Sequence, residues 1–229
     1  MSTLTMTTTK SQPTRSTFHH GDLRSALMST TLDLLVAKGV EGFSLREAAA
    51  AVGVTPSATY KHFSDKGDLL AAIASNGFTE LAVRVETAMN AARGNSHTAA
   101  RKAMAAMEAN GLAYVKFATE QPVVFRLMFG PYGAAGKYRV RGTGASGKDP
   151  YELLAEALDG LLQANVMSAK SRENAELTAW AAVHGLADIL ISGSMSNRLS
   201  ASIEQSVELI VKTLVNGWRP SGISGRKRG

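Results

Sequence analysis

Hydrophobic residues recur at every third or fourth position along most of this chain, which is the spacing of amphipathic helices. In the stretch that follows Ser44, the apolar positions are Leu45, Ala48, Ala49 and Val52. The same periodicity predicts helices over residues 22–38, 45–52, 56–62, 66–93, 97–119, 122–129, 150–166, 172–191 and 200–217. The predicted fold class is therefore all-α.

Capping residues define two short helices near the N-terminus. Ser44 is followed three positions later by Glu47, the spacing of a capping box. Gly53 ends that helix, because glycine adopts a left-handed backbone at little cost. Thr55 and Pro56 then begin the next helix. Two short helices joined by a tight glycine turn are typical of the helix-turn-helix that reads DNA.

The second short helix has a surface suited to DNA. Its side chains are small, hydroxylic, aromatic or basic, so they can approach base edges and phosphates. Lys66 stands in the first turn of the following helix, where the helix dipole favours an anion. A phosphate held between this lysine and the helix N-terminus accounts for its position. A solvated surface lysine is the alternative.

Residues 19–70 closely resemble the N-terminal domain of the tetracycline-repressor (TetR) family of bacterial transcription regulators. The marks of the resemblance are Gly39, Gly42-Phe43-Ser44, Val52-Gly53-Val54, Tyr60-Lys61-His62-Phe63 and Lys66. The Trp180…His184-Gly185 pattern resembles the C-terminal domain of one branch of this family. The resemblance implies a three-helix DNA-binding domain, followed by a helical domain that binds an effector and dimerises.

The resemblance also places Arg46 where the first motif helix faces the groove. There it is expected to read a base, while Tyr60, His62 and Lys66 are expected to grip phosphates. The residues expected to contact DNA are Ser44, Arg46, Thr55, Ser57, Ala58, Thr59, Tyr60, Lys61, His62 and Lys66.

Composition agrees with a regulator but does not establish one. The chain has 229 residues, 45% of them hydrophobic, and a net charge of +6, which permits polyanion binding. It has no cysteine, and no apolar run approaches the ~20 residues of a membrane span. The N-terminus lacks the apolar region of a secretory signal, so a cytoplasmic protein is expected.

Composition shifts divide the chain into four parts. Residues 1–18 are expected to form a disordered basic arm, 19–66 the helix-turn-helix domain, and 67–217 the effector-binding and dimerisation domain. Residues 218–229 are expected to form a flexible basic tail. A basic arm of this kind can also enter a minor groove.

Methionine and aromatic residues concentrate between residues 97 and 129. Such residues usually form plain core, but they also make deformable small-molecule pockets. We expect a neutral or weakly charged, mostly hydrophobic effector, with Tyr114 and His184 as polar contacts. The expected lining is Phe78, Met104, Met107, Tyr114, Phe117, Phe125, Met128, Phe129, Trp180 and His184.

A homodimer is expected to close through a four-helix bundle built from the last two long helices of each chain. Residues of the last helix recur at 4-3-4 spacing, the pattern of a helix-packing seam. The expected interface residues are Trp180, Gly185, Ile203, Val207, Ile210 and Leu214.

No cofactor or catalytic site is expected. Residues 142–147 match G-x-G-x-x-G, but no buried strand precedes them, which favours a glycine-rich basic loop. His184 and Asp188 lie one turn apart on one helix, and Ser192 and Ser194 follow, without a nucleophile turn. The predicted function is a ligand-released transcription repressor on a palindromic operator. The alternatives are a DNA-binding architectural protein with a solid core and, more remotely, a hydrolase that uses His184.

Overall fold

The computed structural model describes residues 20–134, 140–194 and 201–220. These residues form ten helices and no strand, so the all-α prediction is confirmed. The helices are α1 (His20–Lys38), α2 (Leu45–Val52), α3 (Pro56–Tyr60), α4 (Lys66–Gly94), α5 (Ala99–Glu120), α6 (Pro122–Phe129), α7 (Pro150–Gln163), α8 (Ala169–Arg172), α9 (Ala175–Ser192) and α10 (Ile203–Trp218). The predicted N-terminal arm and most of the predicted tail lie outside these ranges.

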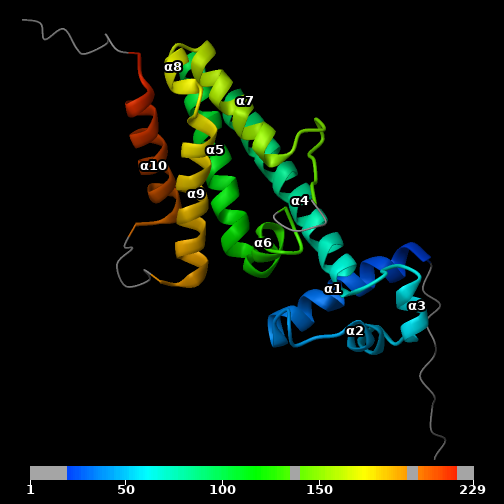
Figure 1. The fold of residues 1–229 in the computed structure, drawn as a ribbon. Coiled ribbons are helices and arrows are strands. Elements are labelled where there is room, and N and C mark those ends of the chain that lie inside the picture. The colour runs from blue at the N-terminus through cyan, green and yellow to red at the C-terminus, as the bar shows by residue number, and fades with distance from the viewer. Residues whose placement is uncertain (1–19, 135–139, 195–200, 221–229) are drawn as a thin grey trace, which may run out of the picture.

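Helices α1 to α3 form a small head at one end of the molecule (Figure 1). Its centre is apolar: Leu27 and Ala48 are fully buried, and Phe43 and Phe63 are almost so. Helix α1 packs on α2, and α2 packs on α3. The head therefore presents α2 and α3 on a common scaffold.

Helix α4 leaves the head and continues into the main body (Figure 1). Its 29 residues span roughly 40 Å at 1.5 Å per residue. Inside the body, α5 packs against α4, α6, α7, α9 and α10 and so lies at the centre of the bundle. One continuous helix thus joins the head to the body.

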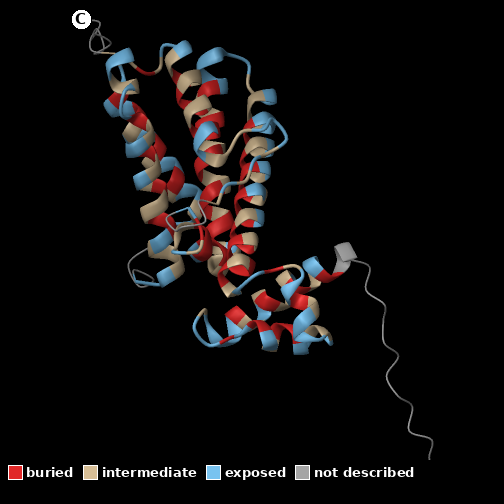
Figure 2. Cartoon of the chain, turned by 45° about the vertical axis from the view of Figure 1, so that its right-hand side comes forward, coloured by how far each residue is buried: buried red, intermediate tan, exposed pale blue. Residues whose placement is uncertain are grey.

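Burial follows the facing sides of the helices (Figure 2). One cluster of apolar side chains runs from the head through α4 into the body, from Leu23 to Trp218. Gly77 marks a close approach within it, because a Cβ there would lie 2.5 Å from Val124 Cγ1 and 2.7 Å from Met128 Sδ. The absence of a side chain at Gly77 lets α6 lie directly against α4.

Two of the helix boundaries that differ from the sequence-based expectation have a clear local cause. The predicted helix over 172–191, capped by Ser171, begins at Ala175 instead, and Ser171 and Arg172 belong to α8, whose cap Ser168 accepts a hydrogen bond from Ser171 N. The predicted helix over 150–166 ends at Gln163, because Asn165 adopts a positive φ of 55°. Turns formed by a few polar residues decided both ends, and the apolar periodicity did not reveal them.

Candidate functional site

The expected caps of the helix-turn-helix are present. The Ser44 side chain accepts a hydrogen bond from Glu47 N, and the Glu47 carboxylate accepts one from Ser44 N at 2.9 Å. Gly53 ends α2 with a φ of 79°, a conformation that favours glycine. Thr55 caps α3 through Ala58 N. These local bonds fix the angle at which α3 leaves α2.

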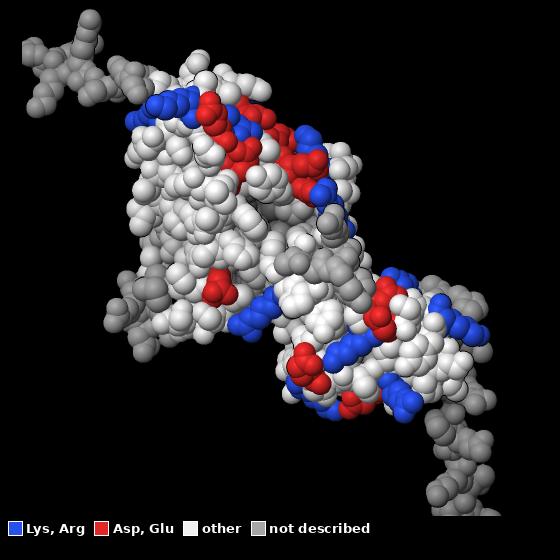
Figure 3. All heavy atoms as spheres, in the orientation of Figure 1, with Lys and Arg blue, Asp and Glu red and all other residues white. Residues whose placement is uncertain are grey.

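Most of the residues expected to contact DNA lie on the outside of the head. Ser44, Arg46, Thr55, Ser57, Tyr60 and Lys61 are exposed, and Ala58, His62 and Lys66 are half-buried. Tyr60 is 52% exposed, which is unusual for so large a ring. Lys and Arg side chains are spread over the head, with Asp and Glu side chains among them (Figure 3).

Thr59 is placed differently from the expectation. Its side chain is fully buried, and Thr59 Oγ1 has no hydrogen-bond partner. A covered side chain cannot reach a base edge, so Thr59 is corrected from a base contact to a core residue. The helical phase of α3 turns Thr59 inward and its neighbours Ser57, Tyr60 and Lys61 outward.

Two cations of the head lie over buried aromatic rings. Lys66 Nζ is 4.7 Å from the centre of the Phe43 ring. The Arg24 guanidinium is 4.4 Å from the centre of the Phe63 ring and donates to His62 O at 3.1 Å. Cation–π contacts orient these side chains while leaving their charge available to an anion. The ring beneath Lys66 is a structural reason for a lysine at the start of α4 that sequence reasoning missed.

The body contains a cavity of about 610 Å³ between α4, α5, α7 and α9. Its volume is in the range of small-molecule sites. Four of the ten residues expected to line a pocket do so: Phe78, Tyr114, Phe129 and Trp180. The further lining residues are Asn110, Ala134, Val140, Arg141, Gly142, Asp149, Pro150, Tyr151, Glu152, Leu154 and Val183.

The other six expected pocket residues do not line this cavity. Met107, Phe117, Phe125 and Met128 are at most 2% exposed and belong to the core. Met104 borders a separate hollow near Arg101 and Arg219. The helical phase of α5 and α6 turns these side chains away from the cavity, so the structure corrects their expected role.

His184, the last of the six, stands behind the cavity wall and supports it. The Tyr114 hydroxyl lies 2.7 Å from His184 Nδ1 and accepts a hydrogen bond from Trp180 Nε1 at 3.2 Å. Burial lowers the pKa of His184, although Asp188 opposes this shift. The lowered pKa favours the neutral imidazole, and the tautomer of His184 decides which of the two groups is the donor. Burial also raises the pKa of Tyr114.

In this arrangement His184 pairs with the Tyr114 hydroxyl, and the serines at the end of α9 bond to one another and to the backbone. The hydroxyl of Ser192 donates to Ile189 O and to Ser194 Oγ, both at the end of α9. Across the residues that the structure describes, no three potential metal ligands cluster.

A strap formed by residues 140–149 closes one side of the cavity and follows α4. Ser75 Oγ donates to Arg141 O at 3.0 Å, and the Glu86 carboxylate accepts from Ser146 N at 3.1 Å. A Cβ on Gly142 would lie 2.7 Å from Ser75 O. Gly142 and Gly144 of the G-x-G-x-x-G match thus lie close against α4, whereas Gly147 has open space around it. Sequence reasoning predicted the loop but not its position.

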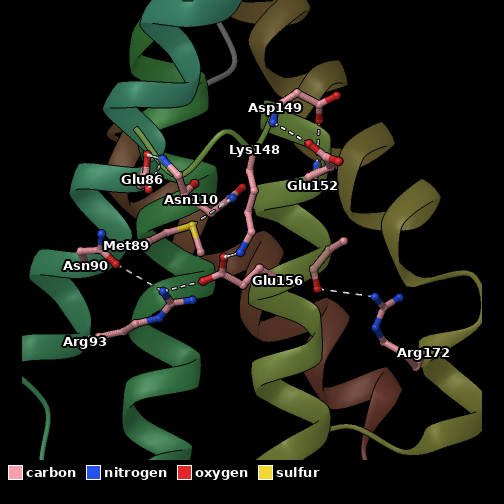
Figure 4. Close-up of polar contacts among 12 residues, drawn as sticks. Glu86, Met89, Asn90, Arg93, Asn110, Lys148, Asp149, Glu152, Glu156 and Arg172 are labelled. Atoms are coloured by element: carbon pink, nitrogen blue, oxygen red, sulfur yellow. Dashed lines mark hydrogen bonds and ion pairs between the residues drawn. The ribbon is translucent and has the colours of Figure 1, made fainter. Parts of the chain in front are cut away.

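Ion pairs join the strap, α4 and α7 (Figure 4). Glu156 on α7 pairs with Lys148 at 2.6 Å and with Arg93 of α4 at 2.7 Å. The hydrogen bond from Lys148 and the pairing with Arg93 lower the pKa of Glu156, against the effect of burial. At the start of α7, Asp149 and Glu152 form a capping box. The strap, α4 and α7 are therefore tied together at one edge.

Asn110 is the residue of the site that sequence reasoning missed and that a signal could have revealed. It is only 5% exposed, and it stands three residues after Met107 and four before Tyr114 on the buried stripe of α5. An amide on an apolar stripe is a cue for a ligand contact or a buried hydrogen bond.

The outer face of α9 and α10 is poor in charge between its two ends (Figure 3). Leu177 is 65% exposed and Leu209 is 67% exposed. Gly185 has open space where a Cβ would stand. Of the expected interface residues, Ile203, Ile210 and Leu214 are partly buried beside this face.

Val207 and Trp180 are placed otherwise. Val207 is 1% exposed and packs inside its own chain, where a Cβ on Gly111 would lie 3.1 Å from Val207 Cγ1. Trp180 turns toward the cavity. The structure therefore corrects Val207 from interface to interior, because the buried stripe of α10 runs through Val207, Val211, Val215 and Trp218. Trp180 is half-buried and lines the cavity, and its interface role stays a prediction.

A capped helix-turn-helix head, carried on a long helix that also borders a cavity, defines a DNA-binding regulator. Residues 27–73 match the family model described as bacterial regulatory proteins of the tetR family. Residues 107–214 match the model described as a tetracyclin repressor-like C-terminal domain. The chain belongs to the TetR family of transcription regulators.

Solved structures agree with this assignment. A protein of unknown function from Rhodococcus sp. RHA1 is 29% identical, with 89% of this chain and 98% of that chain covered and a TM-score of 0.71. The TetR-family regulator PfmR from Thermus thermophilus is 16% identical, with 83% and 97% covered and a TM-score of 0.55. AibR, solved with isovaleryl coenzyme A and operator DNA, is 20% identical, with 86% and 98% covered and a TM-score of 0.52. The last two show the fold alone. No curated protein matches the sequence.

Proposed function

We propose that the protein is a homodimeric transcription repressor that leaves its operator when a small molecule enters the cavity. The observation that carries this proposal is the course of α4. Lys66, at its first turn, stands beside the DNA-facing residues of the head, and Phe78, three turns later, lines the cavity. A ligand against Phe78 therefore acts on the helix that carries the head.

Operator recognition rests on Arg46 and on the exposed side of α3. An arginine in a major groove can bind guanine through two hydrogen bonds, which is worth about 1–3 kcal/mol of discrimination. Ser57, Tyr60 and Lys61 are exposed on the same surface. A two-fold dimer would place two copies of α3 in successive major grooves, so the operator is a palindrome.

Dimerisation is assigned to the charge-poor face of α9 and α10. Leu177 on α9 and Leu209 on α10 are large apolar side chains that are exposed in the single chain, and a partner that covered them would remove their apolar surface from water. Gly185 leaves room for a second backbone to approach. Ile203, Ile210 and Leu214 extend the same face.

The strap gives the ligand a second route to α4. Val140, Arg141 and Gly142 line the cavity, and the strap is hydrogen-bonded to Ser75 and Glu86 of α4. A ligand that displaces the strap therefore alters the contacts along α4. The structure of AibR with a coenzyme A ester and operator DNA supports effector control within this fold, for that protein.

The cavity argues against the alternative function, a DNA-binding architectural protein whose body is a solid core. A packed core leaves few voids larger than a water molecule, whereas this cavity measures about 610 Å³.

Enrichment from a random duplex pool tests the proposal. We expect a palindromic consensus whose half-sites are about 10 base pairs apart. An Arg46→Ala variant should lose preference at one position of each half-site while retaining non-specific binding. A pool that shows no enrichment, or a consensus without two-fold symmetry, would contradict the proposal.

A further inference from the structure

Among the described residues of the cavity lining, Asn110 is the buried polar residue whose hydrogen-bonding capacity is mostly unused. Its Nδ2 donates to Met89 Sδ at 3.4 Å, and sulfur is a weak acceptor (Figure 4). Among the described residues, the fully enclosed side-chain oxygens without a partner belong to Thr31 and Thr59. No hydrogen bond of the described residues involves the Asn110 carbonyl oxygen, and Asn110 lines the cavity. A ligand or a water molecule within the cavity can supply the partner that an interior amide needs.

Tyr114, the polar contact expected from the sequence, has little capacity left for a ligand. Its hydroxyl already pairs with His184 Nδ1 and accepts from Trp180 Nε1. Two of the hydrogen-bonding positions of this hydroxyl are therefore taken within the protein. Asn110 offers both an acceptor and a donor, because a ligand oxygen is a stronger partner for Nδ2 than the Met89 sulfur.

Charge in the described part of the cavity wall is confined to exposed or half-buried residues. The single lining cation there, Arg141, is exposed, as is Glu152, and Asp149 is half-buried. The buried lining around Asn110 is apolar or aromatic, with Phe78, Leu154 and Val183. An anionic group beside Asn110 would lose its hydration without meeting a cation, which is unfavourable. An uncharged group would not incur this cost.

We propose that Asn110 reads the polar group of the effector, and that the effector is an uncharged ring compound with a carboxamide-like donor and acceptor at its buried end. This inference rests on the proposed effector site and narrows its chemistry. The aromatic rings of Phe78, Phe129 and Trp180 stack on the ring system. Carboxylates and phosphates of similar shape are rejected at the same position.

Three matched probes test it by calorimetry on the full chain: 2-naphthamide, 2-naphthoate and 2-isopropylnaphthalene. They share one ring system and differ in a carboxamide, a carboxylate and an apolar group of the same shape. Wild-type protein should bind 2-naphthamide at least about ten-fold tighter than either of the others. Asn110→Leu should abolish the preference for 2-naphthamide over 2-isopropylnaphthalene and keep the affinity for the latter. Asn90→Leu is the matched control and should retain the preference, because Asn90 is an exposed asparagine on α4 outside the cavity lining.

Equal binding of the three probes by wild-type protein would overturn the inference, as would a preference that survives Asn110→Leu or disappears in Asn90→Leu. Failure of every probe to bind would overturn it as well. Enrichment of an operator by the same preparation separates these results from a failure of the proposed function, since DNA recognition does not depend on Asn110. An Asn110→Ser variant, smaller and still polar, provides a second test if the leucine variant does not fold.

Discussion

At the scale of single residues, two buried hydroxyls and a half-buried imidazole each contribute to the stability of the molecule. Thr31 and Thr59 each hide an oxygen without a partner inside the head. A buried polar group without a hydrogen bond costs roughly 1–3 kcal/mol. The head therefore contains two sites at which an apolar side chain of the same shape is favoured.

Thr59→Val is expected to raise the free energy of unfolding by about 1 kcal/mol, because it removes an unpaired hydroxyl at nearly constant shape. Urea unfolding measures this change. Thr119→Val is the matched control and should not stabilise, since Thr119 Oγ1 donates to Val115 O and Lys116 O. If Thr59→Val weakened operator binding at unchanged stability, Thr59 would contact DNA after all.

His184 makes stability depend on pH. Its pKa in the folded protein lies below the ordinary 6.5 because of burial. Between the two pKa values the unfolded chain binds more protons, so the free energy of unfolding falls as pH decreases through 6.5. The free energy of unfolding should therefore fall more between pH 7.5 and pH 5.5 in wild-type protein than in His184→Gln. Equal losses would place the pKa of His184 at its ordinary value.

At the scale of elements, glycine decides how closely helices approach. Gly77 permits the contact between α4 and α6, whereas Gly217 in α10 faces open space. The two positions have the same residue type in the same type of element, with opposite surroundings. They form a matched pair for measuring what the α4–α6 contact contributes.

Gly77→Ala should destabilise the protein by about 1–3 kcal/mol, because its Cβ would overlap Val124 and Met128. Gly217→Ala should stabilise by up to about 1 kcal/mol, the difference in helix propensity. Thermal unfolding of both variants measures the two effects. A neutral Gly77→Ala would mean that α6 moves away from α4 at no cost.

Sequence periodicity and caps predicted the helices well, and the reason is local. The N-caps Ser44 and Thr55 act within their own turn, so their effects are visible in a few consecutive residues. The path of the strap over α4 depends on contacts such as Ser75 with Arg141, which are far apart in sequence. No local pattern encodes such a contact.

The candidate site was predicted only in part, because it also depends on contacts between residues that are far apart in sequence. Apolar stripes showed that α5 and α6 have buried faces, but not which buried side chains border a cavity. Phe129 does and Met128, its neighbour, does not. In α3, a single helical step separates exposed Tyr60 from buried Thr59.

At the scale of the whole molecule, the head, the cavity and the charge-poor face lie on different parts of one chain. Among the residues that the structure describes, no helix is long and apolar enough to cross a membrane. Helix α4 joins the head to the cavity, and α9 joins the cavity wall at Trp180 to the face at Leu177. The head and the cavity thus share α4, and the cavity and the charge-poor face share α9.

Leu209→Glu is expected to weaken the proposed dimer, because it places a carboxylate on the charge-poor face of α9 and α10. Sedimentation at micromolar concentration should show monomers for this variant and dimers for wild type. Val83→Glu is the control, since Val83 is 44% exposed on α4, outside that face. A Leu209→Glu protein that remains fully dimeric would place the interface elsewhere.

Coupling between the cavity and the head is the central claim, and an operator titration with and without a saturating cavity ligand tests it most directly. The ligand is the tightest binder of the naphthalene series, and the duplex is the enriched palindrome. We expect operator affinity to fall by roughly 5–150-fold, and ligand affinity to fall by the same factor on operator-bound protein. Unchanged operator affinity with the cavity saturated would contradict the account.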